Sequence, residues 1–261
     1  MASGSVLLTQ DTKELALREG AMLFGVAGVD RFDGAPRGHH PVEILRGAQT
    51  VVTFGIPLID QVTDWDELFL DSEILGPDLR KTMLQDYLYT EENYNFINDR
   101  LNQVGHRLAL FLQAQGFRSI TFPATFGPGY QSFHDMMPDW MGLFSQRHAA
   151  VRAGLGEFGL NNVVVTPQWG PRVRFNSVIT RAPLQVSPLL EKKVCLGTGC
   201  SICIERCGGQ ALSLRPDFDE EAVWLDPVSR TDKPLCRKKR KDVFCYGRCL
   251  KVCPVGEETT D

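Results

Sequence analysis

The stretch CLGTGCSICIERC, residues 195–207, places four cysteines at the spacing C-x4-C-x2-C-x3-C. Four more follow, at Cys236, Cys245, Cys249 and Cys253. Their spacing is C-x8-C-x3-C-x3-C, and a proline follows the last of them. Thiolates bind iron–sulfur clusters and zinc, and eight thiolates match the ligand count of two 4Fe–4S clusters. The chain has no other cysteine, so this chemistry belongs to one C-terminal module.

The order of the cysteines predicts which of them share a cluster. In the bacterial ferredoxin run C-x2-C-x2-C-x3-C-P, the fourth cysteine of each run binds the cluster of the other run. By that rule, one cluster takes Cys195, Cys200, Cys203 and Cys253. The other takes Cys236, Cys245, Cys249 and Cys207. The gap before Cys200 is longer than in ferredoxins, and glycine replaces proline after Cys207. A longer gap moves a ligand onto a loop without removing it.

Zinc binding and disulfide formation are the two alternative uses of these cysteines. Zinc modules usually pair their cysteines as C-x2-C, whereas each run here ends in C-x3-C, so zinc is disfavoured. Disulfides are typical of secreted chains, but the N-terminus MASGSVLLTQDTKE lacks the basic and apolar regions of a signal peptide. No stretch approaches the ~20 apolar residues that span a bilayer. We therefore expect a cytoplasmic protein without membrane association.

The composition of the chain limits the kinds of partner that it can bind. The chain of 261 residues has a formal net charge of -4 and is 43% hydrophobic, which predicts a folded protein with no overall attraction to nucleic acid. The basic run RKKRK, residues 237–241, is the exception. We expect a solvated loop whose charge offsets that of the clusters. Contact with tRNA phosphates or with an acidic electron donor is the alternative.

The body before the cysteines predicts alternating helices and strands. Asp11 and Glu14 match a D-x-x-E capping box and predict a helix over residues 12–19. An apolar stripe at spacings of three and four predicts a helix from Tyr94 to Phe111 that closes at Gly116. Short apolar runs predict strands over residues 21–29, 50–58 and 118–122. Residues 59–90 show no clear periodicity.

The end of the body predicts a helix and a pair of strands. Residues 145–156 favour a helix that stops at a glycine. Residues 162–166 and 172–180 predict two strands paired around the turn PQWGP. We place the domain boundary near residue 188, with a core over 1–187 and the cysteine module over 188–261.

The stretch GLGEFG matches the dinucleotide-binding pattern G-x-G-x-x-G at Gly154, Gly156 and Gly159. That pattern needs a strand before it and a helix after it, and here the predicted order is reversed. We reject NAD binding. A helix C-cap with close backbone packing is one interpretation, and a backbone that lets a large flat ligand approach is the other.

Residues 147–184 resemble the segment that joins the core to the ferredoxin module in epoxyqueuosine reductases and reductive dehalogenases. The shared pattern is Ala153 to Gly156, then Gly159 and Asn161, an apolar strand, Pro167 and Gly170, and a second strand that ends in Leu184. The stretches around the first two strands and the order of the eight cysteines are also similar to this family. The similarity covers most of the chain.

The resemblance implies an α+β fold, with a nitroreductase-like core and a C-terminal ferredoxin-like module that carries two 4Fe–4S clusters. It implies a core that binds cobalamin without a histidine ligand, with flavin as the alternative occupant. The module would reduce the cobalt, which would then remove oxygen or halide from a small-molecule substrate. Reduced ferredoxin or flavodoxin is the electron donor we expect. The residues that match the family segment, and are therefore expected to contact the cofactor, are Gly154, Gly156, Gly159, Asn161, Pro167 and Gly170.

A side chain near the cofactor would supply the proton. The polar candidates on the loop and helix before the Ala-Gly-Leu-Gly turn are Tyr130, His134, Asp139, Arg147 and His148. Tyrosine and histidine can donate a proton, and arginine can hold an anion. Each can also be a structural loop or capping residue. In epoxyqueuosine reductases an acidic residue precedes this turn, and its position here holds Trp140, with Asp139 next to it.

Two other functions remain at this point. A true epoxyqueuosine reductase acting on tRNA is disfavoured by the displaced acid and by the lack of the C-terminal helical extension that many of these enzymes have. A non-catalytic electron carrier or corrinoid-handling protein would reduce a partner and turn over no substrate.

Overall fold

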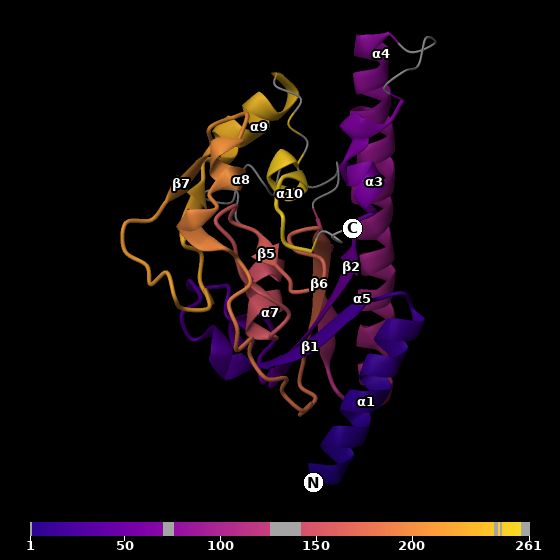
Figure 1. Ribbon diagram of the computed structural model, residues 1–261. Helices are drawn as coiled ribbons and strands as arrows, with labels where there is room; N and C mark the ends of the chain where they lie inside the picture. Colours follow the sequence, from indigo (N-terminus) through magenta and orange to yellow (C-terminus); the bar gives the residue numbers. More distant parts are fainter. Residues whose placement is uncertain (1, 70–75, 126–141, 243–244, 246, 257–261) are drawn as a thin grey trace. The chain divides into compact units, whose positions relative to one another are not determined.

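The computed structural model describes residues 2–69, 76–125, 142–242, 245 and 247–256 (Figure 1). The chain divides into two compact units. Unit 1 comprises residues 1–56, 98–156 and 174–191, and unit 2 comprises residues 57–97, 157–173 and 192–261. The sequence-based division assigned every residue before 188 to one core. The unit that holds the cysteines also takes in residues 57–97 and 157–173.

Unit 1 is built on a four-stranded sheet with the order β1-β2-β6-β3. The strands are β1 (Leu23–Gly28), β2 (Thr50–Pro57), β3 (Ser119–Thr121) and β6 (Val173–Thr180). β1 pairs antiparallel with β2, with Val26 opposite Val52, and β3 pairs antiparallel with β6, with Ile120 opposite Ile179. The strands predicted over 21–29, 50–58 and 118–122 are confirmed, because buried apolar runs rich in β-branched residues suit a covered sheet.

Helices pack on both faces of this sheet. The long helix α5 (Ile97–Ala114) brings Gly105 against Phe54 and Asn176, where an added Cβ would meet their side chains at 3.4 and 3.3 Å. On the opposite face, α7 (Gln146–Arg152) and the residue after it pack with Val51 and Ile179. Residues three apart on one strand point to opposite faces, which accounts for the two layers.

α5 confirms the predicted apolar stripe. Leu101, Val104, Leu108 and Leu112 recur at spacings of three and four, and each is at most 1% exposed. The other helices of unit 1 that the structure describes are α1 (Ala2–Arg18), the 3-10 turn η1 (Val29–Phe32) and the short α2 (Pro41–Ile44).

The start predicted for the first helix is wrong. α1 begins ten residues earlier than the predicted first residue, 12, so Asp11 and Glu14 lie inside the helix. The Glu14 carboxylate accepts a hydrogen bond from Gln10 Nε2 at 2.8 Å instead of closing a capping box. Thr9 and Thr12 donate their hydroxyls to the carbonyls of Ser5 and Leu8, four residues back, which lets them sit inside the helix.

Unit 2 consists of short elements. Residues 60–96 form α3 (Asp60–Thr63), η2 (Trp65–Glu67), α4 (Pro77–Thr82) and the π-helix η3 (Met83–Phe96), which continues directly into α5. Val62, Trp65, Leu84 and Tyr89 form their apolar core. A π-helix closes i→i+5 turns, so its apolar residues do not follow the 3.6-residue period. That explains why residues 59–90 gave no clear pattern.

The cysteines lie among the other elements of unit 2. These are β4 (Glu157–Phe158), β5 (Val164–Val165), η6 (Gly197–Gly199), α8 (Ile202–Glu205), β7 (Leu212–Leu214), β8 (Ser229–Thr231), α9 (Lys233–Asp242) and α10 (Arg248–Lys251). β4 pairs with β5 and β7 pairs with β8, both antiparallel. α8 lies within the first cysteine run and α10 within the second, and the two helices contact each other.

The pairing predicted around the turn PQWGP is wrong. Both strands exist, but β5 pairs with β4, and β6 belongs to the four-stranded sheet. Only a single bridge, between Thr166 and Gly170, closes the turn itself. The expected mixture of helices and strands is confirmed. Among the described residues, no helix is both long and apolar enough to cross a membrane.

Candidate metal centre

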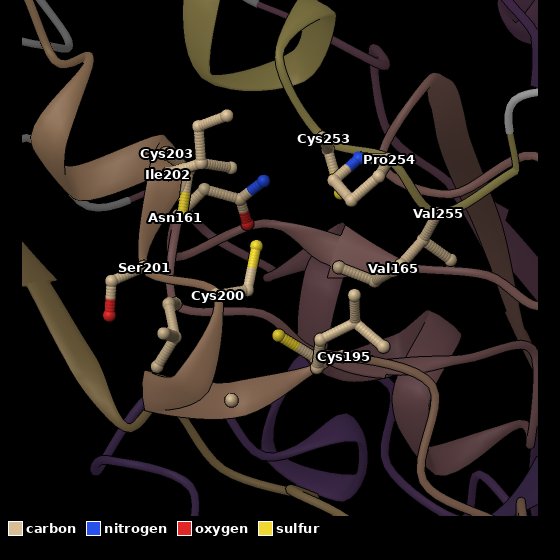
Figure 2. A pocket seen from close by; sticks show the side chains of 13 residues that line it. Asn161, Val165, Cys195, Cys200, Ser201, Ile202, Cys203, Cys253, Pro254 and Val255 are labelled. Carbon is tan, nitrogen blue, oxygen red and sulfur yellow. The ribbon is translucent and has the colours of Figure 1, made fainter.

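Four thiols line one cavity in unit 2. Cys195, Cys200 and Cys203 come from the first run, and Cys253 comes from the second run (Figure 2). The empty space between the lining side chains is about 330 Å³, part of it open to solvent, and Leu160 and Val165 form its apolar wall. The structure therefore brings Cys253 to the three cysteines that the ferredoxin rule assigns to it.

A second group forms around Cys249. Burial is the main cause that raises the pKa of the Cys249 thiol to about 12, and the neighbouring thiols of Cys245, Cys236, Cys203 and Cys207 raise it further. Cys207 is thus a neighbour of the second run, as the crossing rule expects. Cys203 belongs to the first group, so the two groups are adjacent.

Thiols in the first group also perturb one another. Burial, followed by the nearby thiols of Cys195, Cys253 and Cys200, raises the pKa of Cys203 to about 12. Burial raises the pKa of Cys253 to about 11. Thiolates crowded in a low-dielectric site need cationic charge beside them. Such a donor set fits iron or another thiophilic metal.

The spacing of the cysteines discriminates between metals. Zinc modules usually pair their cysteines as C-x2-C, whereas each run here ends in C-x3-C, as ferredoxin runs do. Among the described residues, no three His, Cys, Asp and Glu side chains converge closely enough to hold a single ion. The residues present fit an iron–sulfur cluster.

The stretch from β4 to the start of β6 supports the second cysteine run. Asn161 Nδ2 donates to the Cys249 carbonyl at 3.1 Å, and Asn162 Nδ2 donates to Thr231 Oγ1 at 3.0 Å. Gly170 has φ +50°, and an added Cβ would lie 1.8 Å from the Val255 carbonyl. Only glycine fits there without displacing the chain next to Cys253.

A buried arginine, Arg172, also holds the second cysteine run in place. Arg172 is 4% exposed; its Nη2 donates to the Lys251 carbonyl at 2.8 Å, and its Nη1 bonds Asp60 Oδ1 at 2.9 Å. Asp64 Oδ2 lies 3.8 Å from the same Nη1. Burial raises the pKa of Asp64, and Arg172 opposes that shift. The guanidinium also lowers the pKa of Cys253, against the larger effect of burial. Arg172 was not among the predicted site residues, because an arginine at the start of a predicted strand gives no sign that it will be buried.

The structure resembles solved reductases. It matches an epoxyqueuosine reductase bound to a modified tRNA stem loop at a TM-score of 0.53 and 19% identity, over 78% of this chain and 52% of that chain. It matches the epoxyqueuosine reductase of Streptococcus thermophilus at 0.56 and 16% identity, over 95% and 65%. A catabolic reductive dehalogenase in complex with 3-bromo-4-hydroxybenzoic acid matches at 0.60 and 17% identity, over 95% and 31%.

The chain has the fold of epoxyqueuosine reductases and reductive dehalogenases.

A sequence relative agrees with the shared reductase fold. The tetrachloroethene reductive dehalogenase of Desulfitobacterium hafniense is 30% identical over 96 residues, which are 36% of this chain and 17% of that protein. No family model matches the chain. The resemblance inferred from the sequence is confirmed. The chain spans about half the length of the first of the solved reductases and a smaller share of the dehalogenases.

Arg147 and His148 are the proton-donor candidates that the structure describes, and both lie in unit 1. Tyr130, His134 and Asp139 lie outside the described residues, as does Trp140. Ser145 is the N-cap of α7, and its Oγ lies 2.7 Å from His148 Nδ1. Burial lowers the pKa of Arg147. The His148 ring thus contacts the N-cap of its own helix, and its catalytic role stays a prediction.

The glycine-rich turn confirms the helix C-cap interpretation. α7 ends at Arg152 and is capped at Ala153, and Gly154 follows with φ +77°. An added Cβ on Gly154 would lie 2.0 Å from the Pro188 carbonyl, so the chain itself fills that space. Backbone packing accounts for glycine at Gly154 and Gly170. The cofactor contacts expected at Gly154, Gly156, Gly159, Asn161, Pro167 and Gly170 stay predictions.

Proposed function

We propose that the chain is an iron–sulfur reductase that passes electrons through two 4Fe–4S clusters to a corrinoid, for reductive removal of oxygen or halide from a small molecule. The observation that carries the proposal is the cavity lined by Cys195, Cys200 and Cys203 of the first run together with Cys253 of the second run. This crossed arrangement is typical of two-cluster ferredoxins.

The proposed ligands divide as the crossing rule predicts. Cys195, Cys200, Cys203 and Cys253 hold the first cluster, and Cys236, Cys245, Cys249 and Cys207 hold the second. When bound, the clusters supply one-electron transfer between a donor and an acceptor. The chain places the thiolates, buries them, and positions the second run through Asn161 and Arg172.

The proposals for the corrinoid and for the substrate are based on the proteins that this chain resembles. The structure of one reductive dehalogenase suggests a mechanism for B12-dependent dehalogenation, and another was solved in complex with 3-bromo-4-hydroxybenzoic acid. The sequence relative is named a tetrachloroethene reductive dehalogenase. We assign unit 1 as the nitroreductase-like core and unit 2 as the ferredoxin-like module. Reduced ferredoxin or flavodoxin is the proposed donor, and His148 and Arg147 are the described candidates for proton delivery and anion binding.

Metal analysis tests the cluster assignment. The anaerobically purified full chain should contain about eight irons and about eight sulfides. Zinc without sulfide would contradict the proposal.

Single cysteine variants test the crossing. Cys253→Ala should damage the cluster of the first run, and Cys207→Ala the cluster of the second, each seen as a loss of about half the iron. Electron paramagnetic resonance of the reduced protein identifies which cluster remains. Equal loss of both clusters in both variants would contradict the crossing.

Titration of the cluster-loaded protein with cob(II)alamin tests the corrinoid. A cobalt signal without an axial nitrogen ligand, saturating at one equivalent, would support it. Absence of binding would contradict the proposed corrinoid. Flavin binding or an electron-carrier function would then be the hypothesis to test.

A further inference from the structure

Glu157 is a buried carboxylate beside the first cysteine run. It is the first residue of β4 and is 0% exposed. Its Oε1 accepts hydrogen bonds from the backbone N–H groups of Val194 and Cys195, at 2.5 and 2.6 Å. Its Oε2 accepts one from the N–H of Trp224 at 2.8 Å.

A buried carboxylate is costly unless it is compensated. Three charge-assisted hydrogen bonds from backbone donors provide that compensation here. They also satisfy three backbone groups that neither a helix nor a strand supplies with a partner. The partners come from two loops far apart in sequence, so one side chain fixes both loops to β4.

Contacts around Trp224 also hold the loops that Glu157 binds. Trp224 Nε1 donates to the Asp219 carbonyl at 2.7 Å, and Lys193 Nζ lies 3.1 Å from the centre of the indole ring. Lys193 also donates to the Ala222 carbonyl at 3.3 Å. Lys193, Val194 and the N–H of Cys195 are therefore held, and the backbone that leads into Cys195 has little freedom.

We propose that Glu157 is a positioning residue for the first cluster: its carboxylate fixes Cys195 for ligation and places a negative charge beside the bound cluster. The inference rests on the proposed function. The carboxylate is too far inside the chain to be screened by solvent, so its charge acts on the cluster at close range. Reduction adds negative charge to a cluster, and a nearby carboxylate lowers its reduction potential.

Two substitutions separate positioning from charge. In Glu157→Gln, the amide oxygen can still accept from Val194 and Cys195, while the charge is lost and the amide N–H faces the Trp224 N–H. Glu157→Ala removes every acceptor. Glu205→Gln is the matched control, because it removes the same charge from an exposed residue between Cys203 and Cys207.

The experiment uses the full chain, reconstituted anaerobically with iron and sulfide, and measures iron content, the spectrum of the reduced clusters and their midpoint potentials. Glu157→Ala should lose about half the bound iron, with the signal of the first cluster gone and that of the second kept. Glu157→Gln should keep its iron and shift the potential of the first cluster to a more positive value. Glu205→Gln should match the wild-type protein in all three.

The outcomes distinguish the two proposals. If the wild-type chain does not take up about eight irons, the proposed function fails. If it does, but Glu157→Gln has the wild-type potential and Glu157→Ala keeps the first cluster, only the role of Glu157 fails. Should Glu157→Ala not fold, the potential of Glu157→Gln decides alone.

Discussion

At the scale of single residues, the candidate metal centre includes side chains that hold the cysteine runs without being proposed metal ligands. Arg172 contacts the second cysteine run through the Lys251 carbonyl and pairs with Asp60, although it is almost completely buried. Gly170 allows the backbone next to Cys253 to approach closely. Substitution of Arg172 and substitution of Gly170 lead to separate predictions.

Replacing Arg172 by glutamine should destabilise the protein. The change removes a buried positive charge and leaves the Asp60 and Asp64 carboxylates without it, so we expect a loss of about 3–5 kcal/mol in the free energy of unfolding. Urea unfolding followed by circular dichroism measures the loss. Arg172→Lys should recover part of the lost stability, because lysine restores the positive charge but not the hydrogen bonds to both Asp60 and the Lys251 carbonyl.

Arg206→Gln is the matched control, since Arg206 is exposed in the same unit. It should change the free energy of unfolding by less than about 0.5 kcal/mol. An equal effect of the two substitutions would show that burial of Arg172 contributes nothing to stability.

Gly170→Ala should disturb the site of the first cluster. The new Cβ would be strained at positive φ and would collide with the Val255 carbonyl, which displaces the segment that carries Cys253. We expect about half the iron to be lost and about 1–3 kcal/mol of stability with it. Iron analysis and thermal unfolding check both. Gly199→Ala, next to Cys200 but with nothing within 4 Å of the new Cβ, should retain the full iron content.

At the scale of elements, the apolar face of α5 holds the core of unit 1. Leu108 is 0% exposed, whereas Leu110, two residues further on, is 49% exposed. Leu108→Ala should cost about 2–5 kcal/mol because it leaves a cavity against the sheet. Leu110→Ala should be within about 0.5 kcal/mol of the wild type. Urea unfolding measures both, and a similar cost for the two would contradict the described orientation of α5.

Sequence patterns predicted the elements whose structure is set locally. The period of α5 and the β-branched runs of β1 and β2 follow from the residues themselves. The spacing of the cysteines indicated their grouping in the same way. The start of α1 and the burial of Glu157 and Arg172 depend on contacts across more than 30 residues, which a local sequence pattern does not show. The π-helix η3 was missed because its period differs from the one sought.

At the scale of the whole molecule, the two units should respond differently to loss of metal. Unit 2 has short strands and short helices around crowded thiols, so bound metal contributes much of its stability. Unit 1 has a four-stranded sheet covered on both faces. After removal of iron with a chelator, hydrogen exchange should accelerate in β7, β8, α8 and α10.

The pairing between β1 and β2 should keep its protection in the same experiment, and serves as the internal control. Equal loss of protection in both units would show that unit 1 does not hold its structure without the metal-bearing unit.

The interleaving of the two units limits how the electron-transfer part could be transplanted. An engineer who cut the gene before residue 192 and fused the last 70 residues to another protein would move all eight cysteines. That cassette would leave behind Glu157, Asn161 and Arg172, which anchor the two cysteine runs. A portable version would have to carry residues 157–173 as well, joined in a new chain order.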